Sequence, residues 1–176
     1  MRGTLTLALA GNPNAGKTSI FNALTGSRHH VGNWPGKTVS KMEGTFRHGG
    51  LVGRLVDLPG TYSLSALSPE EIIARDYLLT GEADAVIDVV DSTNLERNLY
   101  LTAQLLELGI PLILALNVSD SARSQGIKID HQRLSALFGR APIVETVGHR
   151  AQGLDQLMDA ALRLVEPSSA QLRLIA

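Results

Sequence analysis

The sequence contains no cysteine, few aromatic residues and no excess of either charge. Without cysteine the chain can form neither a disulfide framework nor a thiolate site, which fits the reducing cytosol. It has 16 lysine and arginine residues against 17 aspartate and glutamate residues, and the basic residues form no block. Because nucleic-acid-binding surfaces need clustered positive charge, the composition gives no reason to expect a nucleic-acid partner.

Long apolar segments are also missing. The longest runs, such as residues 111–116, are far shorter than the roughly 20 apolar residues that a transmembrane helix needs. We therefore expect no direct insertion of this chain into a membrane. No signal peptide is visible, because the first residues lead almost at once into a strand-like run. The 176 residues, of which 44% are hydrophobic, suit one domain with a real core.

Short apolar runs alternate with helical patterns along the chain. The apolar runs are residues 5–10, 51–58, 85–91, 111–117 and 142–146, and the helical patterns are 17–25, 69–79, 95–108, 130–138 and 153–165. A more polar run, residues 38–47, is expected to pair antiparallel with 51–58. These patterns predict an α/β fold with a mostly parallel six-stranded sheet, one antiparallel strand and helices on both faces. We assign residues 1–166 to one domain, 28–37 to a loop and 167–176 to a linker.

One segment is the strongest indicator of function. Residues 11–19 fit G-x-x-x-x-G-K-[ST], the loop that surrounds nucleotide phosphates, and they lie between a strand-like run and a helical pattern as this loop requires. A chance match in a chain this long is expected roughly once in a hundred or more sequences. The residues predicted to contact the nucleotide here are Gly11, Asn12, Pro13, Asn14, Ala15, Gly16, Lys17, Thr18 and Ser19.

The chemistry of phosphate binding explains these residue types. Gly11 and Gly16 allow a tight turn without a Cβ in the way. Successive N–H groups then point at an anion bound at a helix N-terminus. Lys17 supplies a positive charge for the β- and γ-phosphates, and the Thr18 hydroxyl is a candidate Mg²⁺ ligand.

A second motif, Asp57-Leu58-Pro59-Gly60, closes another apolar run. An aspartate at that strand end can hold Mg²⁺, and the Gly60 N–H can meet a γ-phosphate, which would tie the following segment to the nucleotide state. An ordinary turn is the alternative explanation of a D-x-x-G sequence. Its position 40 residues after Lys17 favours metal binding.

Two later strand ends are candidates for base recognition. In Asn117-Val118-Ser119-Asp120, the Asp120 carboxylate can accept two hydrogen bonds from guanine N1–H and the N2 amino group, a donor pair that adenine lacks. Val118 replaces the usual lysine, and a helix N-cap by Asp120 is the alternative reading. After the last strand, a backbone N–H of Thr146, Val147 or Gly148 can reach guanine O6.

Thr38 is the candidate switch threonine, whose hydroxyl and carbonyl would reach Mg²⁺ and the γ-phosphate. Several threonines lie nearby, so the pattern alone does not choose Thr38. We interpret Trp34 as a loop anchor, and the five histidines show no spacing typical of a metal site. The segment predicted to contact the nucleotide consists of Gly36, Lys37, Thr38, Val39 and Ser40.

The order of these motifs resembles translation-factor-related GTPase domains. Residues 11–19, 31–39, 57–64 and 68–77 resemble the ferrous-iron transport protein B (FeoB) family, most specifically in the N-W-P-G and Y-S-L-S…S-P-E-E stretches, and the resemblance covers about residues 4–165. It implies a Ras-like P-loop GTPase fold that binds GTP and GDP. It also implies a cytosolic G domain on the cytoplasmic face of the bacterial inner membrane.

In that family a small helical domain and an iron-transporting membrane region follow the G domain. Neither is recognisable in this sequence, so we expect an isolated G domain. The resemblance also implies that Thr38 is the switch threonine and that Asn14 helps hold a K⁺ ion that speeds hydrolysis.

The expected activity is slow GTP hydrolysis that regulates or drives ferrous iron uptake by a parent transporter. Thr61 stands where many G proteins carry glutamine, so catalysis is expected to depend on Lys17, Thr38, the Gly60 backbone, Mg²⁺ and a monovalent cation near Asn14. The alternatives are a ribosome-assembly GTPase and a nucleotide sensor with little turnover.

Overall fold

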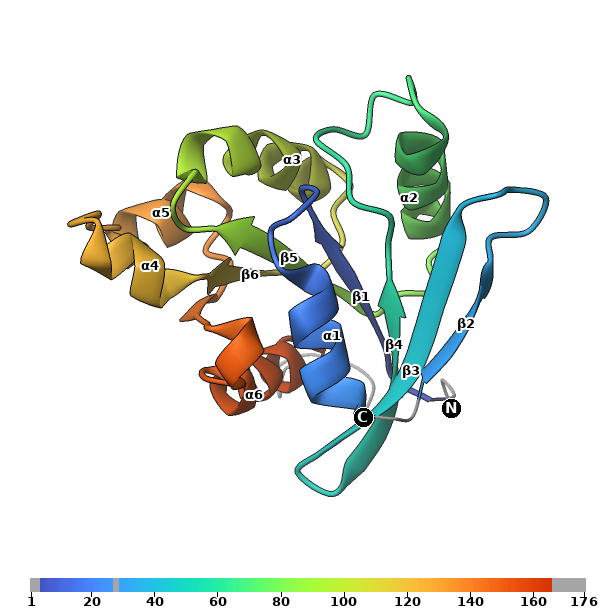
Figure 1. The fold of residues 1–176 in the computed structure, drawn as a ribbon, viewed down its shortest axis with the longest axis horizontal. Helices are drawn as coiled ribbons and strands as arrows, with labels where there is room; N and C mark the ends of the chain where they lie inside the picture. Colours follow the sequence, from blue (N-terminus) through green and yellow to red (C-terminus); the bar gives the residue numbers. More distant parts are fainter. Residues whose placement is uncertain (1–3, 27–28, 166–176) are drawn as a thin grey trace, which may run out of the picture.

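The computed structural model describes residues 4–26 and 29–165. Within them, one seven-stranded sheet runs in the order β2-β3-β4-β1-β5-β6-β7 (Figure 1). The strands are β1 Thr6–Gly11, β2 His29–Asn33, β3 Ser40–His48, β4 Leu51–Asp57, β5 Ala85–Asp91, β6 Leu112–Asn117 and β7 Ile143–Glu145. The helices are α1 Lys17–Thr25, α2 Pro69–Leu79, α3 Leu95–Glu107, α4 Ser119–Ser124, α5 His131–Leu137, the 3₁₀ turn η1 Gly148–Arg150, and α6 Leu154–Val165.

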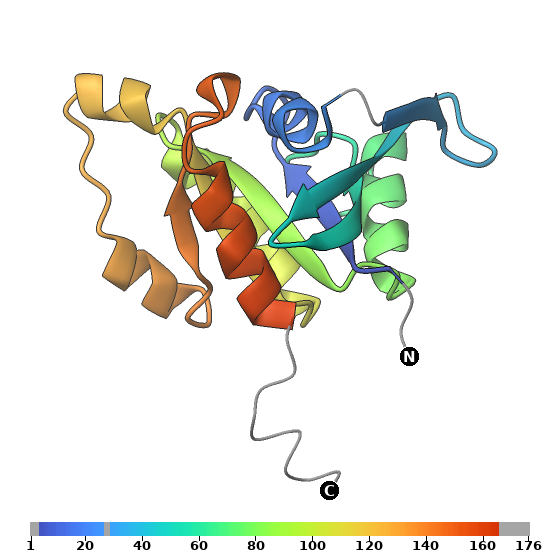
Figure 2. The same ribbon diagram turned by 90° about the horizontal axis from the view of Figure 1, so that it is seen from below.

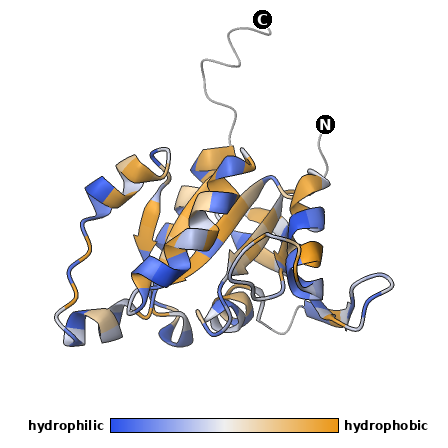
Figure 3. Ribbon diagram, turned by 90° about the horizontal axis from the view of Figure 1, so that it is seen from above, coloured by the Kyte–Doolittle hydropathy of each residue, from blue (hydrophilic) through white to orange (hydrophobic). Residues whose placement is uncertain are grey.

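Helices cover both faces of the sheet (Figures 1 and 2). One hydrophobic cluster packs α2, α3 and α5 on one face, and a second packs α1 and α6 on the other. Strands β1, β5 and β6 are buried along almost their whole length, and Figure 3 shows hydrophobic residues concentrated on the central strands. This two-sided burial explains their continuous apolar runs. The predicted α/β fold with a mostly parallel sheet is confirmed.

The predicted strand number is wrong, and so is the first part of one predicted loop, whereas residues 34–37 of that loop lie outside any strand or helix. Residues 29–33, expected within a loop, form β2, which pairs antiparallel with β3; β3 in turn pairs antiparallel with β4. The sheet therefore has two antiparallel pairs. Four of the five residues of β2 are exposed, so no apolar alternation marked the strand. Residue 28 and the predicted linker 167–176 lie outside the described residues.

Across the described residues, every helix is too short or too polar to cross a membrane.

A carboxyl group lies inside the core next to the first strand. Asp88 of β5 is 1% exposed, and the Thr102 hydroxyl of α3 donates to its Oδ2 at 2.5 Å. Burial raises the pKa of Asp88 to about 7, against the opposing effects of the Thr102 hydrogen bond and the Lys17 charge. The fold therefore raises the pKa of this carboxyl group well above that of an exposed aspartate.

The Asp88 carboxyl predicts a pH dependence of stability. Its pKa is about 7 in the folded chain and about 4 in an unfolded chain, so the folded state binds more protons between these values. Its contribution to stability should therefore decline as pH rises from about 4 to about 7. Asp88→Asn keeps an oxygen acceptor for Thr102 and cannot ionise. We expect the unfolding free energy of Asp88→Asn relative to the unmodified chain to rise by up to a few kcal/mol from pH 5 to pH 8. Urea unfolding at both pH values checks this, and parallel pH profiles would contradict it.

Candidate nucleotide-binding site

The sequence-predicted motifs meet at the carboxyl ends of β1, β4 and β6, where open α/β sheets bind ligands (Figure 1). Gly11 ends β1, Asp57 ends β4 and Asn117 ends β6. Strand β1 pairs in parallel with β4 and with β5, and β5 pairs in parallel with β6. The carboxyl ends of these strands therefore lie at one edge of the sheet. Segments separated by up to about a hundred residues thus form one surface.

The loop from Gly11 to Lys17 requires glycine at both of its predicted positions. Gly11 has φ 149°, and a Cβ there would lie 2.5 Å from the Val89 carbonyl oxygen of β5. Gly16 has φ 95°, and a Cβ there would overlap the Asn117 side-chain nitrogen. Asn14, at the exposed tip of the loop, also has a left-handed φ of 65°. The loop therefore packs tightly against two neighbouring strands while its outer side stays open.

A buried lysine and a carboxyl group lie close enough together beside this loop that each charge shifts the pKa of the other. Lys17 is buried, and burial lowers its pKa, while the charges of Asp57 and then Asp88 raise it. Burial raises the pKa of Asp57 to about 6, and the Lys17 charge lowers it. Each group is thus held where its charged form lacks water, and an anionic ligand beside Lys17 would favour the charged ammonium.

The Asp57–Gly60 segment lies directly against the phosphate loop. The Thr61 N–H donates to the Gly11 carbonyl at 3.2 Å. A Cβ on Gly60 would lie 3.1 Å from Pro13 Cα and 3.3 Å from Lys17 Nζ. Leu58 is buried and Pro59 half-buried. The motif is therefore part of the site and more than a surface turn.

The oxygen groups here fit a hard divalent cation. Asp57 Oδ1 is buried and has no hydrogen-bond partner among the described residues, and the exposed Thr18 follows Lys17 in α1. In the described part of the chain, no three His, Asp or Glu side chains gather into a metal site. Mg²⁺, which favours one or two protein oxygens plus phosphates and water, suits such a sparse set.

The Asn117 side chain joins three segments of the site. Its Nδ2 donates to the Ala15 carbonyl at 2.9 Å. Its Oδ1 accepts from the Thr146 hydroxyl at 3.1 Å and from the Gly148 N–H at 2.9 Å. Asn117 is 2% exposed, so these bonds are shielded from water. The asparagine therefore holds the phosphate loop and the segment after β7 in a fixed relation.

Asp120 lies in the first turn of α4, and Val118, with a left-handed φ of 51°, occupies the N-cap. The N-cap alternative for Asp120 is therefore wrong. Its Oδ1 accepts from the Ser121 N–H at 2.9 Å, and its Oδ2 lies 3.5 Å from Arg150 of η1. The carboxylate remains partly open to a ligand, with a cation beside it.

The Thr146–Gly148 segment is fully buried, and its N–H groups already have acceptors. Thr146 donates to the Leu116 carbonyl, and Val147 donates to the Gln152 carbonyl. Gly148 donates to Asn117, as described above. A base contact from Gly148 would have to share that N–H, a constraint that the pattern did not show.

The Gly36–Ser40 segment does not join the site. It follows Trp34 in the connection between β2 and β3, which projects away from the phosphate loop (Figures 1 and 2). Thr38 is exposed, and among the described residues no hydrogen bond or ion pair links this segment to residues 11–19. Trp34 is buried against Tyr77 of α2, which confirms its reading as an anchor.

Two residues next to the site, Asp88 and Arg150, are not predicted by any sequence motif. Asp88 lies within the apolar run of β5 and belongs to no recognisable motif. The one signal in the sequence is a charged residue among apolar ones. Arg150 reaches Asp120 from a turn 30 residues further along the chain, and nothing in its own sequence context signals the contact.

Comparisons with known proteins agree with this geometry. The sequence profile of a family described as ferrous iron transport protein B matches residues 5–161. The Fe(2+) transporter FeoB of Escherichia coli K12 is 54% identical over 157 residues, which cover 87% of this chain and 20% of that protein. The chain thus spans about a fifth of the length of the curated relatives it matches.

Solved structures show the same fold. The G domain of T. maritima FeoB is 47% identical, with a TM-score of 0.85, over 93% of this chain and 100% of that one. A GDP-bound variant of the S. thermophilus FeoB G domain is 51% identical, with a TM-score of 0.84, over 89% of this chain and 60% of that one.

The Asn117 contacts predict a structural cost. Asn117→Ala leaves the Ala15 carbonyl and the Gly148 N–H without partners, and a buried unsatisfied group costs about 1–3 kcal/mol. We expect the unfolding free energy to fall by at least that amount in urea titrations. Asn22→Ala, which truncates an exposed asparagine of α1, is the control and should change stability little. Equal midpoints for both variants would contradict the role of Asn117.

Proposed function

This chain belongs to the ferrous iron transport protein B (FeoB) family, and from that premise we propose that it binds GTP and hydrolyses it slowly as the G domain of a ferrous iron transporter. The observation that carries the proposal is the cluster of Lys17, Asp57 and Gly60 against the Gly11–Gly16 loop. A positive charge and glycine-rich backbone at a helix N-terminus suit a polyphosphate.

Each residue of the cluster has a proposed role. Lys17 would neutralise the β- and γ-phosphates, and the Gly60 N–H would contact the γ-phosphate. Thr18 and Asp57 would hold Mg²⁺, with Thr38 joining them in the GTP state. Mg²⁺ would neutralise charge on the phosphate oxygens. Residues 11–19, 36–40, 57–60, 117–120 and 146–148 remain the proposed nucleotide contacts.

Base selection is assigned to Asp120. Its carboxylate is half-buried and near the Asn117 contact to the phosphate loop, so base and phosphate contacts would share one framework. Adenine lacks the donor pair that this acceptor would recognise. We propose guanine nucleotides as the ligands, and ATP as a weak competitor.

Among the described residues, the position where many G proteins carry glutamine holds a buried threonine, so we infer that no side chain there activates water. Thr61 is 4% exposed, and its N–H is used by Gly11. Turnover would then depend on electrostatic stabilisation, with K⁺ at Asn14 acting as an additional positive charge. The same observation favours a second candidate, a nucleotide sensor with little turnover, and multiple-turnover phosphate release distinguishes the two.

The remaining proposals concern the parent protein. The curated relatives are Fe(2+) transporters about five times as long as this chain. We propose that GTP binding here regulates or drives iron uptake through a membrane region, at the cytoplasmic face of a bacterial inner membrane. Residues 1–166 would form the G domain, and 167–176 would lead towards a helical domain.

Asp120→Asn tests guanine recognition. Loss of a paired acceptor should lower GTP affinity roughly tenfold or more and raise affinity for xanthosine triphosphate, whose base offers the complementary group. Calorimetry with both nucleotides measures the change. Asp155→Asn, which alters an exposed carboxylate of α6, is the control. Unchanged GTP binding by Asp120→Asn would remove the assignment.

Thr38→Ala tests the switch residue. Because the exposed loop would reach the metal only when a γ-phosphate is present, the variant should lose most hydrolysis while its GDP affinity stays within a few fold. Phosphate release and GDP titration give the two values. Thr45→Ala serves as the matched control, and normal turnover in Thr38→Ala would assign the role elsewhere.

Comparison of GTP with ATP, in K⁺ and in Na⁺, tests the function as a whole. Intrinsic turnover of small G proteins is on the order of 10⁻³ per second or less, and an added positive charge can raise it by several powers of ten. We expect faster phosphate release from GTP in K⁺ than in Na⁺ at equal ionic strength, and no such difference in Asn14→Ala. Equal rates in both salts would exclude the K⁺ mechanism, whereas preference for ATP would overturn the function.

A further inference from the structure

A pocket separate from the phosphate site lies between the Trp34 loop (residues 34–39) and α2. Its volume is about 320 Å³, and its apolar walls are Trp34, Pro35, Ile72, Ile73 and Tyr77. The rest of its lining is polar or charged and consists of Lys37, Lys41, Asp76, Thr80 and Glu82. Ligand-binding pockets typically measure about 300–1,000 Å³ and combine apolar walls with polar groups that orient the ligand. The size and lining therefore suit a compact molecule with an apolar body and a polar head.

The Trp34 loop forms one wall of this pocket by resting on α2. Trp34 is 7% exposed and packs edge-to-face on Tyr77, with ring centroids 5.4 Å apart. Two backbone bonds of 3.0 Å, from Lys37 N–H to the Trp34 carbonyl and from Trp34 N–H to the Val39 carbonyl, close the loop. Seating Trp34 thus fixes where the neighbouring Thr38 lies.

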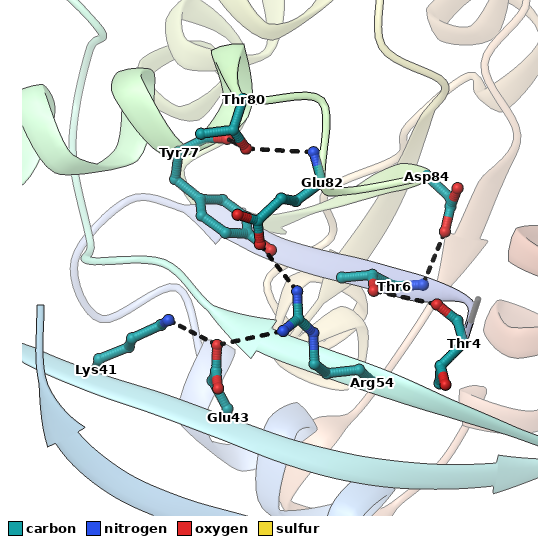
Figure 4. A network of polar contacts seen from close by, with 9 residues as sticks. All are labelled: Thr4, Thr6, Lys41, Glu43, Arg54, Tyr77, Thr80, Glu82 and Asp84. Carbon is teal, nitrogen blue, oxygen red and sulfur yellow. Dashed lines mark hydrogen bonds and ion pairs between the residues drawn. The ribbon is translucent and has the colours of Figure 1, made fainter. Parts of the chain in front are cut away.

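Charges at the pocket rim are paired, with one exception. Glu43 binds Lys41 at 2.7 Å, and Glu82 binds Arg54 at 3.0 Å (Figure 4). Asp76, also at the rim, is paired with Arg75. Lys37 has no ion pair within the described residues. Within the part of the chain that the structure describes, Lys37 is therefore the rim cation without an ion-pair partner, and it lies beside the apolar walls of the pocket.

We propose that this pocket binds a compact apolar carboxylate, and that its occupancy holds the Trp34 loop, with Thr38, away from the phosphate site. The apolar body would lie against Trp34, Ile72 and Ile73, and the carboxylate would pair with Lys37. The carboxylate could belong to a free small molecule or to a peptide C-terminus. The regulatory half of the inference rests on the proposed GTPase function.

The coupling follows from the placement of the loop. Thr38 can reach the phosphate site only if the loop leaves α2, which removes Trp34, Pro35 and Lys37 from the pocket. A ligand that needs those walls binds only the form in which Trp34 is packed on α2. By linkage, this ligand lowers the affinity for GTP by the same factor by which GTP lowers the affinity for this ligand. The buried Trp34 Nε1–H lacks an acceptor in the described part of the chain, a cost that makes the seated form easier to displace.

Trp34, the only tryptophan in the sequence, reports binding directly. The probe is 4-phenylbutyrate, which does not absorb at the tryptophan excitation wavelength, titrated into the nucleotide-free chain. 4-Phenylbutan-1-ol and 4-phenylbutylamine carry the same body with a neutral or positive head. We expect a saturable change in Trp34 emission and the order carboxylate, alcohol, amine in decreasing affinity. An absent response, or tighter binding of the amine, would overturn the proposal.

Two variants locate the head group and the body. Lys37→Gln should weaken phenylbutyrate up to about fivefold, the value of an exposed charge pair, and leave phenylbutanol unchanged; Lys128→Gln, at an exposed lysine remote in sequence, should change neither. Tyr77→Phe keeps the ring, and Figure 4 shows the Tyr77 hydroxyl beside the Glu82–Arg54 pair, so it should bind normally. NMR shifts should concentrate on Ile72, Ile73 and the Trp34 indole, and shifts elsewhere would overturn the site.

The coupling is tested separately from the binding. Phenylbutyrate affinity should fall at least threefold when GDP is replaced by a non-hydrolysable GTP analogue, and phosphate release should slow as the probe saturates. Equal affinity in both nucleotide states would overturn the regulatory half. A tripeptide that ends in Phe, with its C-terminal amide as the control, distinguishes a peptide source from a free acid. If the pocket takes a peptide C-terminus, the tripeptide acid should displace the probe at a lower concentration than a free acid does. If the pocket takes a free acid, the order should be reversed. A chain that binds phenylbutyrate but no guanine nucleotide would refute the proposed function and leave the pocket standing.

Discussion

The Asn117 carboxamide is the contact on which the geometry of the site depends. One buried side chain bonds the phosphate loop at Ala15 and the segment after β7 at Thr146 and Gly148. A Cβ on Gly16 would overlap the Asn117 side chain, so this position requires glycine. Because a buried amide left unpaired is costly, these segments are fixed together, and a ligand's phosphate and base would meet surfaces already in register.

Burial of charge is the second constraint. The Lys17 charge lowers the pKa of both Asp57 and Asp88, and their charges raise the pKa of Lys17, yet burial has the largest effect on each group. Such groups reduce the stability of the folded chain when they are charged without a partner. A polyphosphate with Mg²⁺ would supply the missing charges, so in our proposal the ligand would stabilise the fold as well as occupy the site.

The segments that Asn117 joins are fixed to the core, whereas the connection between β2 and β3 is attached to the fold separately. The connection between β2 and β3 is anchored on α2 through Trp34 and Tyr77, on the other side of the fold from β6, the strand that ends at Asn117 (Figure 1). The Lys41–Glu43–Arg54–Glu82 series of charges links β3, β4 and the turn between α2 and β5 (Figure 4). Trp34 belongs to the hydrophobic cluster beneath α2, and Val39 packs against it, so release of this connection, as our proposal requires, would remove one edge of that cluster while leaving the Asn117 contacts in place.

The sequence by itself predicted the sheet class, the glycine-rich loop between β1 and α1 and the family, because these features are local: apolar runs of buried strands, and glycines at positions where a Cβ would not fit. It missed β2, since an exposed edge strand buries too little to leave an apolar pattern. It also missed Asp88 beside Lys17 and Arg150 beside Asp120, which are distant in sequence. Only the tertiary structure decided that Asn117 bonds both the phosphate loop and the segment after β7, and that Thr38 stands apart from the phosphate loop, because both depend on how separate strands and helices pack.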